Sequence, residues 1–138
     1  SVKPNYQKKI SGPMLDRIDL HVEVPRVEFE KLAKDSLAES STDIRKRVEA
    51  ARERQNQRFK DSSVITNSDM KNKEIKEFCK LDDASMELMR QAVQHMHLSA
   101  RSYHRILKLS RTIADLDDSD DIKQIHVAEA LQYRAKVG

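Results

Sequence analysis

The feature that most constrains the fold of this chain is a helical spacing of apolar side chains. From Ile44 to Leu131 they recur every three or four residues, which is the spacing of helices that bury one face. Only 2 glycines and 3 prolines occur among 138 residues, and these are the residues that most disfavour helix. The sequence therefore predicts a mainly α-helical protein built around a helical bundle.

Residues that cap helix N-termini divide this region into separate helices. Helices are expected to begin near residues 44, 71, 84, 100 and 126. Hydroxyls at 40–42, the carboxylates of Asp82 and Asp83, and Ser99 are the candidate caps. The inward face of the third helix is predicted to carry these residues: Met86, Met89, Val93 and Met96.

The first part of the chain has a different pattern. Pro13 is suited to begin a short helix, because its fixed φ is already helical. Leu20, Val22 and Val24 then alternate with polar residues, which predicts a β-strand that ends at Pro25. A single strand cannot form a sheet, so its partners are expected in another part of a longer protein.

Composition limits the expected cellular location and partners of the protein, but it does not indicate a function. The net charge of +3 is too small to indicate a nucleic-acid partner by itself. One cysteine, Cys79, cannot form an internal disulfide and suits a reducing compartment. No apolar run is long enough to span a membrane and no signal peptide is seen, so a cytoplasmic protein without a membrane partner is expected.

Three stretches carry a family resemblance. They are Tyr6–Pro25, with its run SGPMLDRIDL, then Leu98–Leu116, and last Ile125–Arg134. Together they resemble the magnesium-chelatase-like AAA+ ATPases, the family of Mg chelatase subunit I, and especially the bacterial ComM-type members. The stretches occur in the family's order, whereas residues 26–95 match in pattern more than in motif.

The resemblance implies a fold and a division of the chain. Residues 1–33 would be the C-terminal edge of a truncated α/β ATPase core, which leaves one short helix and one strand. Residues 34–138 would be the helical lid domain, with the polar stretch 34–42 as the hinge.

The resemblance also implies roles for three arginines. Arg17 stands where the family has its arginine finger, which reaches the ATP of a neighbouring subunit. Arg101 stands at the position of the sensor 2 arginine of the lid, and Arg105, one helical turn on, is the second candidate for that role. Guanidinium suits both roles, because it is always charged and can bond two phosphate oxygens at once.

The chain has no Gly-rich phosphate loop and no acidic strand end for magnesium. ATP and Mg²⁺ are therefore expected in the full-length protein, and neither is expected to bind this chain alone. The implied partners are the protein's own ATPase core and neighbouring subunits of a ring, which the family suggests is a hexamer. By itself the chain is expected to be a monomer without enzymatic activity.

Other interpretations of the same residues stay open. Arg17 lies between Asp16 and Asp19 and could form only a local ion pair. The basic run from Arg45 to Lys60 could bind DNA phosphates, although a solvated helix face is the preferred interpretation. A free-standing nucleic-acid-binding module and a helical adaptor for protein partners are the alternative functions. In the full-length protein, DNA processing and metal insertion are both candidate tasks.

Two clusters could suggest metal binding, and neither has the required pattern. The aspartates from Asp115 to Asp121 lack the central glycine and closing glutamate of a calcium loop, so a solvated loop is expected. His95, His97 and His104 have spacings that match no standard metal signature. No metal ligand is assigned.

Overall fold

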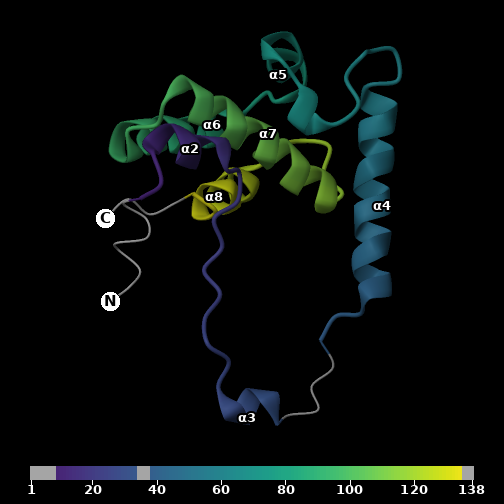
Figure 1. The fold of residues 1–138 in the computed structure, drawn as a ribbon. Coiled ribbons are helices and arrows are strands. Elements are labelled where there is room, and N and C mark those ends of the chain that lie inside the picture. The colour runs from purple at the N-terminus through teal and green to yellow at the C-terminus, as the bar shows by residue number, and fades with distance from the viewer. Residues whose placement is uncertain (1–8, 34–37, 135–138) are drawn as a thin grey trace.

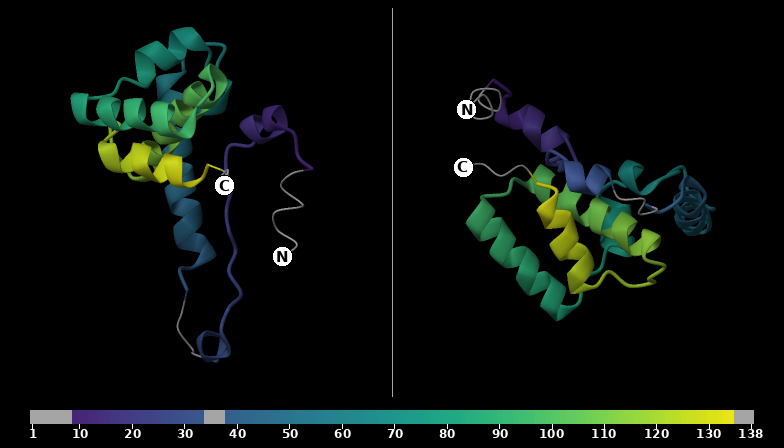
Figure 2. Two further views of the ribbon diagram at one scale, coloured as in Figure 1. Left: turned by 90° about the vertical axis from the view of Figure 1, so that its left-hand side faces the viewer. Right: turned by 90° about the horizontal axis from the view of Figure 1, so that it is seen from below.

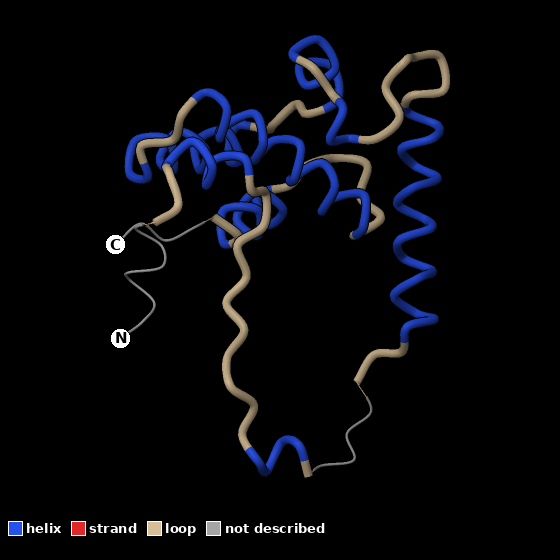
Figure 3. Tube along the Cα trace, in the orientation of Figure 1, coloured by secondary structure: helices blue, strands red, loops and turns tan. Residues whose placement is uncertain are grey.

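The computed structural model of this chain describes residues 9–33 and 38–134. Within these ranges every regular element is a helix, and no β-strand occurs (Figure 3). The elements are α2 (Gly12–Arg17), α3 (Phe29–Leu32), α4 (Ser41–Arg58), the short 3-10 helix η1 (Asn67–Asp69), α5 (Asn72–Phe78), α6 (Asp83–Met96), α7 (Ala100–Leu116) and α8 (Gln124–Gln132). The predicted mainly helical fold is thus confirmed, and α4 to α8 correspond to the expected bundle helices.

The helix starts follow from local side-chain chemistry. Ser40, Asp82 and Ser99 each accept a hydrogen bond from a backbone N–H in the first turn of the helix that follows. These bonds satisfy N–H groups that would otherwise have no partner. Ser11 caps α2 in the same way, and Pro13 lies in its first turn as expected.

The core lies around α7. This helix contacts α8, α4, α5 and η1, and α6 packs on α8 (Figures 1 and 2). Met89, Ile106 and Val127 are fully buried at the junction. Each comes from a different helix, so the core joins α6, α7 and α8 into one unit.

The predicted inner face of α6 is partly wrong. Met86 and Met96 are 40% and 41% exposed, whereas the buried residues of α6 are Ser85, Met89 and Ala92. Small residues at 85 and 92 let α6 approach its neighbours closely, which turns the larger methionines toward solvent.

The expected strand over Leu20–Val24 is not formed. The segment is extended and leaves α2 as a long connection to α3, and it pairs with no strand among the described residues (Figure 1). Val22 and Val24 are 65% and 83% exposed. A strand needs a neighbouring strand to accept its backbone hydrogen bonds, whereas the His21 N–H donates to the carbonyl of Tyr133, which follows helix α8, at 2.6 Å.

The expected hinge over 34–42 falls partly on residues 34–37, which lie outside the described residues. The division into 1–33 and 34–138 stays a prediction.

Helix α4 is held to the bundle at one end. Its buried residues are Ala51 and Gln55, with Phe59 buried just after its last turn. Ile44 and Val48, nearer its start, are exposed, and this half of α4 stands clear of the bundle (Figure 1).

A buried ionic cluster ties α4 to α7. Asp115 accepts two hydrogen bonds from Arg58, at 2.8 and 2.6 Å, and one from Asn67 Nδ2 at 2.8 Å. Arg111 Nη2 lies 3.3 Å from Asp115 Oδ1. The carboxylate is fully buried and has three partners, which is the condition under which a buried charge is tolerated.

Candidate functional site

Arg17 is the last residue of α2, and its side chain is exposed. A cation at this position is favoured by the negative end of the helix dipole. Arg17 has no hydrogen bond or ion pair within the described ranges. Among the residues that the structure describes, it is therefore an exposed guanidinium without a partner.

The aspartates on either side of Arg17 are paired with other arginines. Asp16 Oδ1 accepts a hydrogen bond from Arg134 Nη2 at 3.1 Å, and Asp19 Oδ1 accepts one from Arg105 Nη1 at 2.7 Å. The alternative of a local ion pair between Arg17 and these aspartates is thus wrong.

Arg101 lies in the first turn of α7, two residues after the N-cap Ser99. Its side chain is exposed and has no hydrogen bond or ion pair with any described residue. Backbone N–H groups and the positive end of the helix dipole are also found at this end of a helix, and both favour an anion.

Arg105 forms an ion pair, in contrast to Arg101. Its ion pair with Asp19 crosses from α7 to the segment after α2, and its side chain is 29% exposed. Of the three arginines chosen from sequence, two therefore have no partner among the described residues, and the third holds two elements together.

Asp16 is ionised over most of the accessible pH range. Burial raises its pKa, but hydrogen bonds from Ser102, Arg134 and Ser99 lower the pKa below its ordinary value of 3.8. Ser99 Oγ donates to Asp16 Oδ2 at 3.2 Å, so the residue that caps α7 also contacts α2.

The role of Arg134 could not be recognised from the sequence. Its side chain is nearly buried, and its Nη2 bonds both Asp16 and Ser102 Oγ, each at 3.1 Å. The Arg134–Asp16 pair is separated by 118 positions in the chain, so no local pattern could have indicated it.

The basic run on α4 is partly used inside the protein. Arg54 bonds Asp118 Oδ1 at 2.6 Å and Asp120 Oδ1 at 2.8 Å, and Arg58 bonds Asp115. Arg47 pairs with Glu39. These pairs reduce the positive charge that α4 can offer to a nucleic acid, while the remaining basic residues of the run are exposed: Arg45, Lys46, Arg52 and Lys60.

The aspartate loop is a docking element as well as a solvated loop. Besides its pairs with Arg54, it supplies Asp117, whose Oδ2 lies 2.8 Å from His126 Nε2. The N–H of Lys123 donates to His126 Nδ1 at 2.9 Å, which leaves Nε2 as the ring nitrogen that faces Asp117. Within residues 9–33 and 38–134, no three His, Cys, Asp or Glu side chains converge on a possible metal position.

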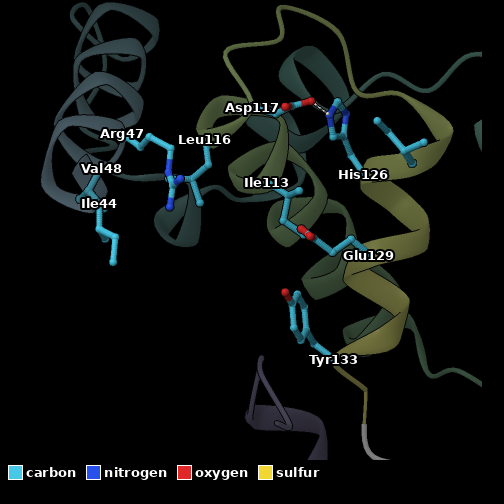
Figure 4. A pocket seen from close by; sticks show the side chains of 10 residues that line it. Ile44, Arg47, Val48, Ile113, Leu116, Asp117, His126, Glu129 and Tyr133 are labelled. Atoms are coloured by element: carbon cyan, nitrogen blue, oxygen red, sulfur yellow. Dashed lines mark hydrogen bonds and ion pairs between the residues drawn. The ribbon is translucent and has the colours of Figure 1, made fainter. Parts of the chain in front are cut away.

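An open groove of about 580 Å³ lies between α4, α7 and α8 (Figure 4). Ile44 and Val48 face it from α4, and Ile113 and Leu116 face it from α7 (Figure 4). The lining is completed by Arg47 of α4, by Asp117 directly after α7, and by residues of α8 and its C-terminal end: Ile125, His126, Glu129 and Tyr133. Nowhere in the described ranges is a helix both long and apolar enough to cross a membrane.

Similarity to known proteins extends over nearly the whole chain. The family described as magnesium chelatase, subunit ChlI C-terminal, matches residues 38–134. The family described as magnesium chelatase, subunit ChlI, matches residues 1–32.

Individual proteins agree with the family matches. Competence protein ComM of Haemophilus influenzae is 44% identical over 133 residues, which are 96% of this chain and 25% of that protein. The protein YifB of Escherichia coli is 42% identical over 131 residues, covering 94% of this chain and 25% of YifB. A protein of Mycobacterium tuberculosis is 31% identical over 97% of this chain and 26% of its own length. The chain thus spans about a quarter of the length of the relatives that it matches.

Proposed function

Because this chain belongs to the magnesium chelatase subunit ChlI family, whose C-terminal region it matches over residues 38–134, we propose that it is the helical lid part of a ring-forming AAA+ ATPase. In this proposal Arg17 acts on the ATP of the neighbouring subunit, and Arg101 contacts the nucleotide of its own subunit. The remainder of the ATPase supplies the site that binds ATP.

One observation carries the proposal. Arg17 and Arg101 are exposed and unpaired within the described ranges, while Asp16 is paired with Arg134 and Asp19 with Arg105. An exposed guanidinium that has no carboxylate partner is available to an external anion. Two guanidiniums without a partner among the described residues suit such an anion, and triphosphate is the anion that the family's chemistry requires.

The role proposed for these two guanidinium groups is to stabilise negative charge on the transferred phosphoryl group. When the γ-phosphoryl group is transferred, negative charge is spread over its oxygens, and a fixed guanidinium stabilises that charge without having to reorganise. Arg101 at the start of α7 would add the helix dipole to its own charge.

The remaining parts of an ATP site do not fit the residues of this chain. Its 2 glycines are at positions 12 and 138, so no Gly-rich phosphate loop can be formed. The carboxylates near Arg17 are taken up by Arg134 and Arg105, which makes them unsuitable for Mg²⁺. We assign the phosphate loop and the magnesium ligands to the remainder of the full-length protein.

Mixing subunits of the full-length protein tests the two arginine roles. Arg17→Ala subunits should bind ATP but hydrolyse it poorly, with a loss of about 10³ to 10⁵ in rate if the finger is as important as in well-studied NTPases. Subunits with an inactivated phosphate loop but an intact Arg17 should restore part of this activity, because they lend their finger to the intact ATP site of the first subunit.

Arg101→Ala subunits should not be restored in this way, because the missing group belongs to the same subunit as the ATP site. Lys46→Ala, which removes an exposed cation of α4, is the matched control and should leave ATP turnover unchanged. Equal restoration of both arginine variants, or full activity in both, would show that the roles are wrongly assigned.

The task of the motor is a separate proposal. One relative is named a competence protein and the matching family is named after magnesium chelatase, so DNA processing and metal insertion are both candidates. A DNA task gains limited support from α4, since three of its basic side chains are already paired within the protein.

A further inference from the structure

Helix α2 contacts α7 without contributing to the core (Figure 1). None of its residues is buried: Met14 is 51% exposed and Leu15 is half-buried, and Ile18, directly after the helix, is 39% exposed. Apolar burial at α2 is therefore too small to fix by itself how α2, with Arg17 at its end, is oriented relative to the bundle.

Polar contacts on both sides of Arg17 take this role. Before it, Asp16 bonds Arg134 and Ser99, at 3.1 and 3.2 Å. After it, Asp19 bonds Arg105 at 2.7 Å. The two arginines lie on different elements, since Arg105 is in α7 and Arg134 follows α8.

Two separate attachments restrict the orientation of α2 more than a single attachment does. A single ion pair leaves the attached segment free to turn about it, whereas a second contact a few residues away fixes the direction of the helix between them. Arg17 lies between the two attachment points, so its direction is set by the position of α7 and of the end of α8.

We propose that Asp16 and Asp19, through Arg134 and Arg105, form a clamp that couples the arginine finger Arg17 to the lid that carries Arg101. Arg105 is then a positioning residue and not a nucleotide ligand. A movement of the lid on ATP at its own site shifts Arg17, which serves the neighbouring site. The inference rests on the proposed function of the two free arginines.

The chemistry of the contacts suits reversible coupling. The Asp19–Arg105 pair is 48% and 29% exposed, so water can replace its partners at small cost. The Asp16–Arg134 pair is less exposed and has Ser99 and Ser102 as further partners. The Asp16–Arg134 attachment is thus the more stable of the two, and the Asp19–Arg105 ion pair can break more easily.

Charge reversal in the full-length protein tests the coupling by ATP turnover. Asp19→Arg and Arg105→Asp each place like charges opposite one another, and each should lower kcat about tenfold or more with KM for ATP within twofold of the parent. The double variant Asp19→Arg/Arg105→Asp restores the pair in reverse and should recover most of the kcat. Arg90→Gln removes a surface ion pair within α6 of the same type and should change neither constant.

A distance measurement gives a readout that does not depend on catalysis. Nitroxide labels on Met14→Cys in α2 and Gln94→Cys in α6, with other accessible cysteines of the full-length protein replaced, report how α2 lies relative to the bundle. The parent should give a narrow distance distribution. Asp16→Ala/Asp19→Ala should broaden it, and the charge-reversed pair should keep it narrow.

The outcomes separate the clamp from the function on which it rests. An unchanged distance distribution in Asp16→Ala/Asp19→Ala, or no recovery of kcat in the charge-reversed pair, overturns the clamp. A large rise in KM for ATP in Arg105→Asp that the reversal does not repair also overturns it, because Arg105 would then bind nucleotide directly. If Arg17→Ala keeps full activity while the distances respond as expected, the finger role fails and the clamp between α2 and the lid is supported.

Discussion

Removing the Asp115 carboxylate should be the most damaging single change to the folded bundle. In Asp115→Ala the guanidinium of Arg58 loses two hydrogen bonds, and the Asn67 amide loses one. The side chain of Arg111 is only 5% exposed, so its charge would stay buried without its carboxylate. Breaking a buried ion pair from one side typically costs about 3–5 kcal/mol, because the partner charge is left without compensation.

The matched control is Asp120→Ala. This carboxylate also pairs with an arginine of α4, Arg54 at 2.8 Å, but its side chain is 91% exposed. An exposed ion pair is worth about 1 kcal/mol or less, because water solvates both groups when they separate. The two variants therefore differ in burial and not in the kind of bond removed.

Urea unfolding followed by circular dichroism at 222 nm measures both changes. With a denaturant dependence of about 2 kcal/mol per molar urea, Asp115→Ala should lower the midpoint by about 2 M, and Asp120→Ala by about 0.5 M or less. Similar midpoints for the two variants would refute the reasoning, since burial of the pair would then not decide its contribution.

Three further predictions concern the Cys79 thiol, the Asp16 carboxylate and ATP binding by this chain alone. Burial raises the pKa of the Cys79 thiol to about 11, so at pH 8 the native chain should react with Ellman's reagent at least tenfold more slowly than the chain in 6 M urea; equal rates would contradict the buried position. Because the pKa of Asp16 is lowered by hydrogen bonds in the folded protein, its contacts with α7 stabilise the fold above pH 3.8 and are lost as the pH falls through the lower folded value. Carboxyl ¹³C titration should give a midpoint below 3.8 that rises in Arg134→Gln, and an unmoved midpoint would rule out that pair as a cause. Titration calorimetry of this chain alone with a slowly hydrolysed ATP analogue should show no saturable site in the micromolar range, because the phosphate loop lies elsewhere, and a low-micromolar site would contradict the proposed division of labour.

Much of the fold could be predicted from the sequence, because its determinants are local. The caps at Ser40, Asp82 and Ser99 lie beside the helices that they begin, and the apolar spacing of α7 lies within one helix. The strand prediction at Leu20–Val24 was wrong for a non-local reason, since a β-strand forms only when a second strand pairs with it. The inner face of α6 was only partly predicted, because hydropathy favours methionine inside whereas close packing favoured Ser85 and Ala92.

The candidate site, too, could be predicted from the sequence only in part. Arg17 and Arg101 were chosen through family motifs, and the structure adds that both are unpaired within the described ranges. The pairs that surround them join residues 86 and 118 positions apart, and no spacing rule covers such distances. The aspartate loop is solvated as expected, but its ion pair with Arg54 could not be predicted, because the two are 64 positions apart.

Helix α4 has the mechanics of a cantilever. Its support begins at Ala51, and the ten residues back to Ser41 extend about 15 Å beyond it without a buried contact. A tilt of about 10° at the support would displace the free tip by about 3 Å, because displacement grows with distance from the pivot. The Arg58 and Arg54 ion pairs act at the supported end, so small changes in these bonds are enlarged at Ile44 and at the wall of the groove that it forms.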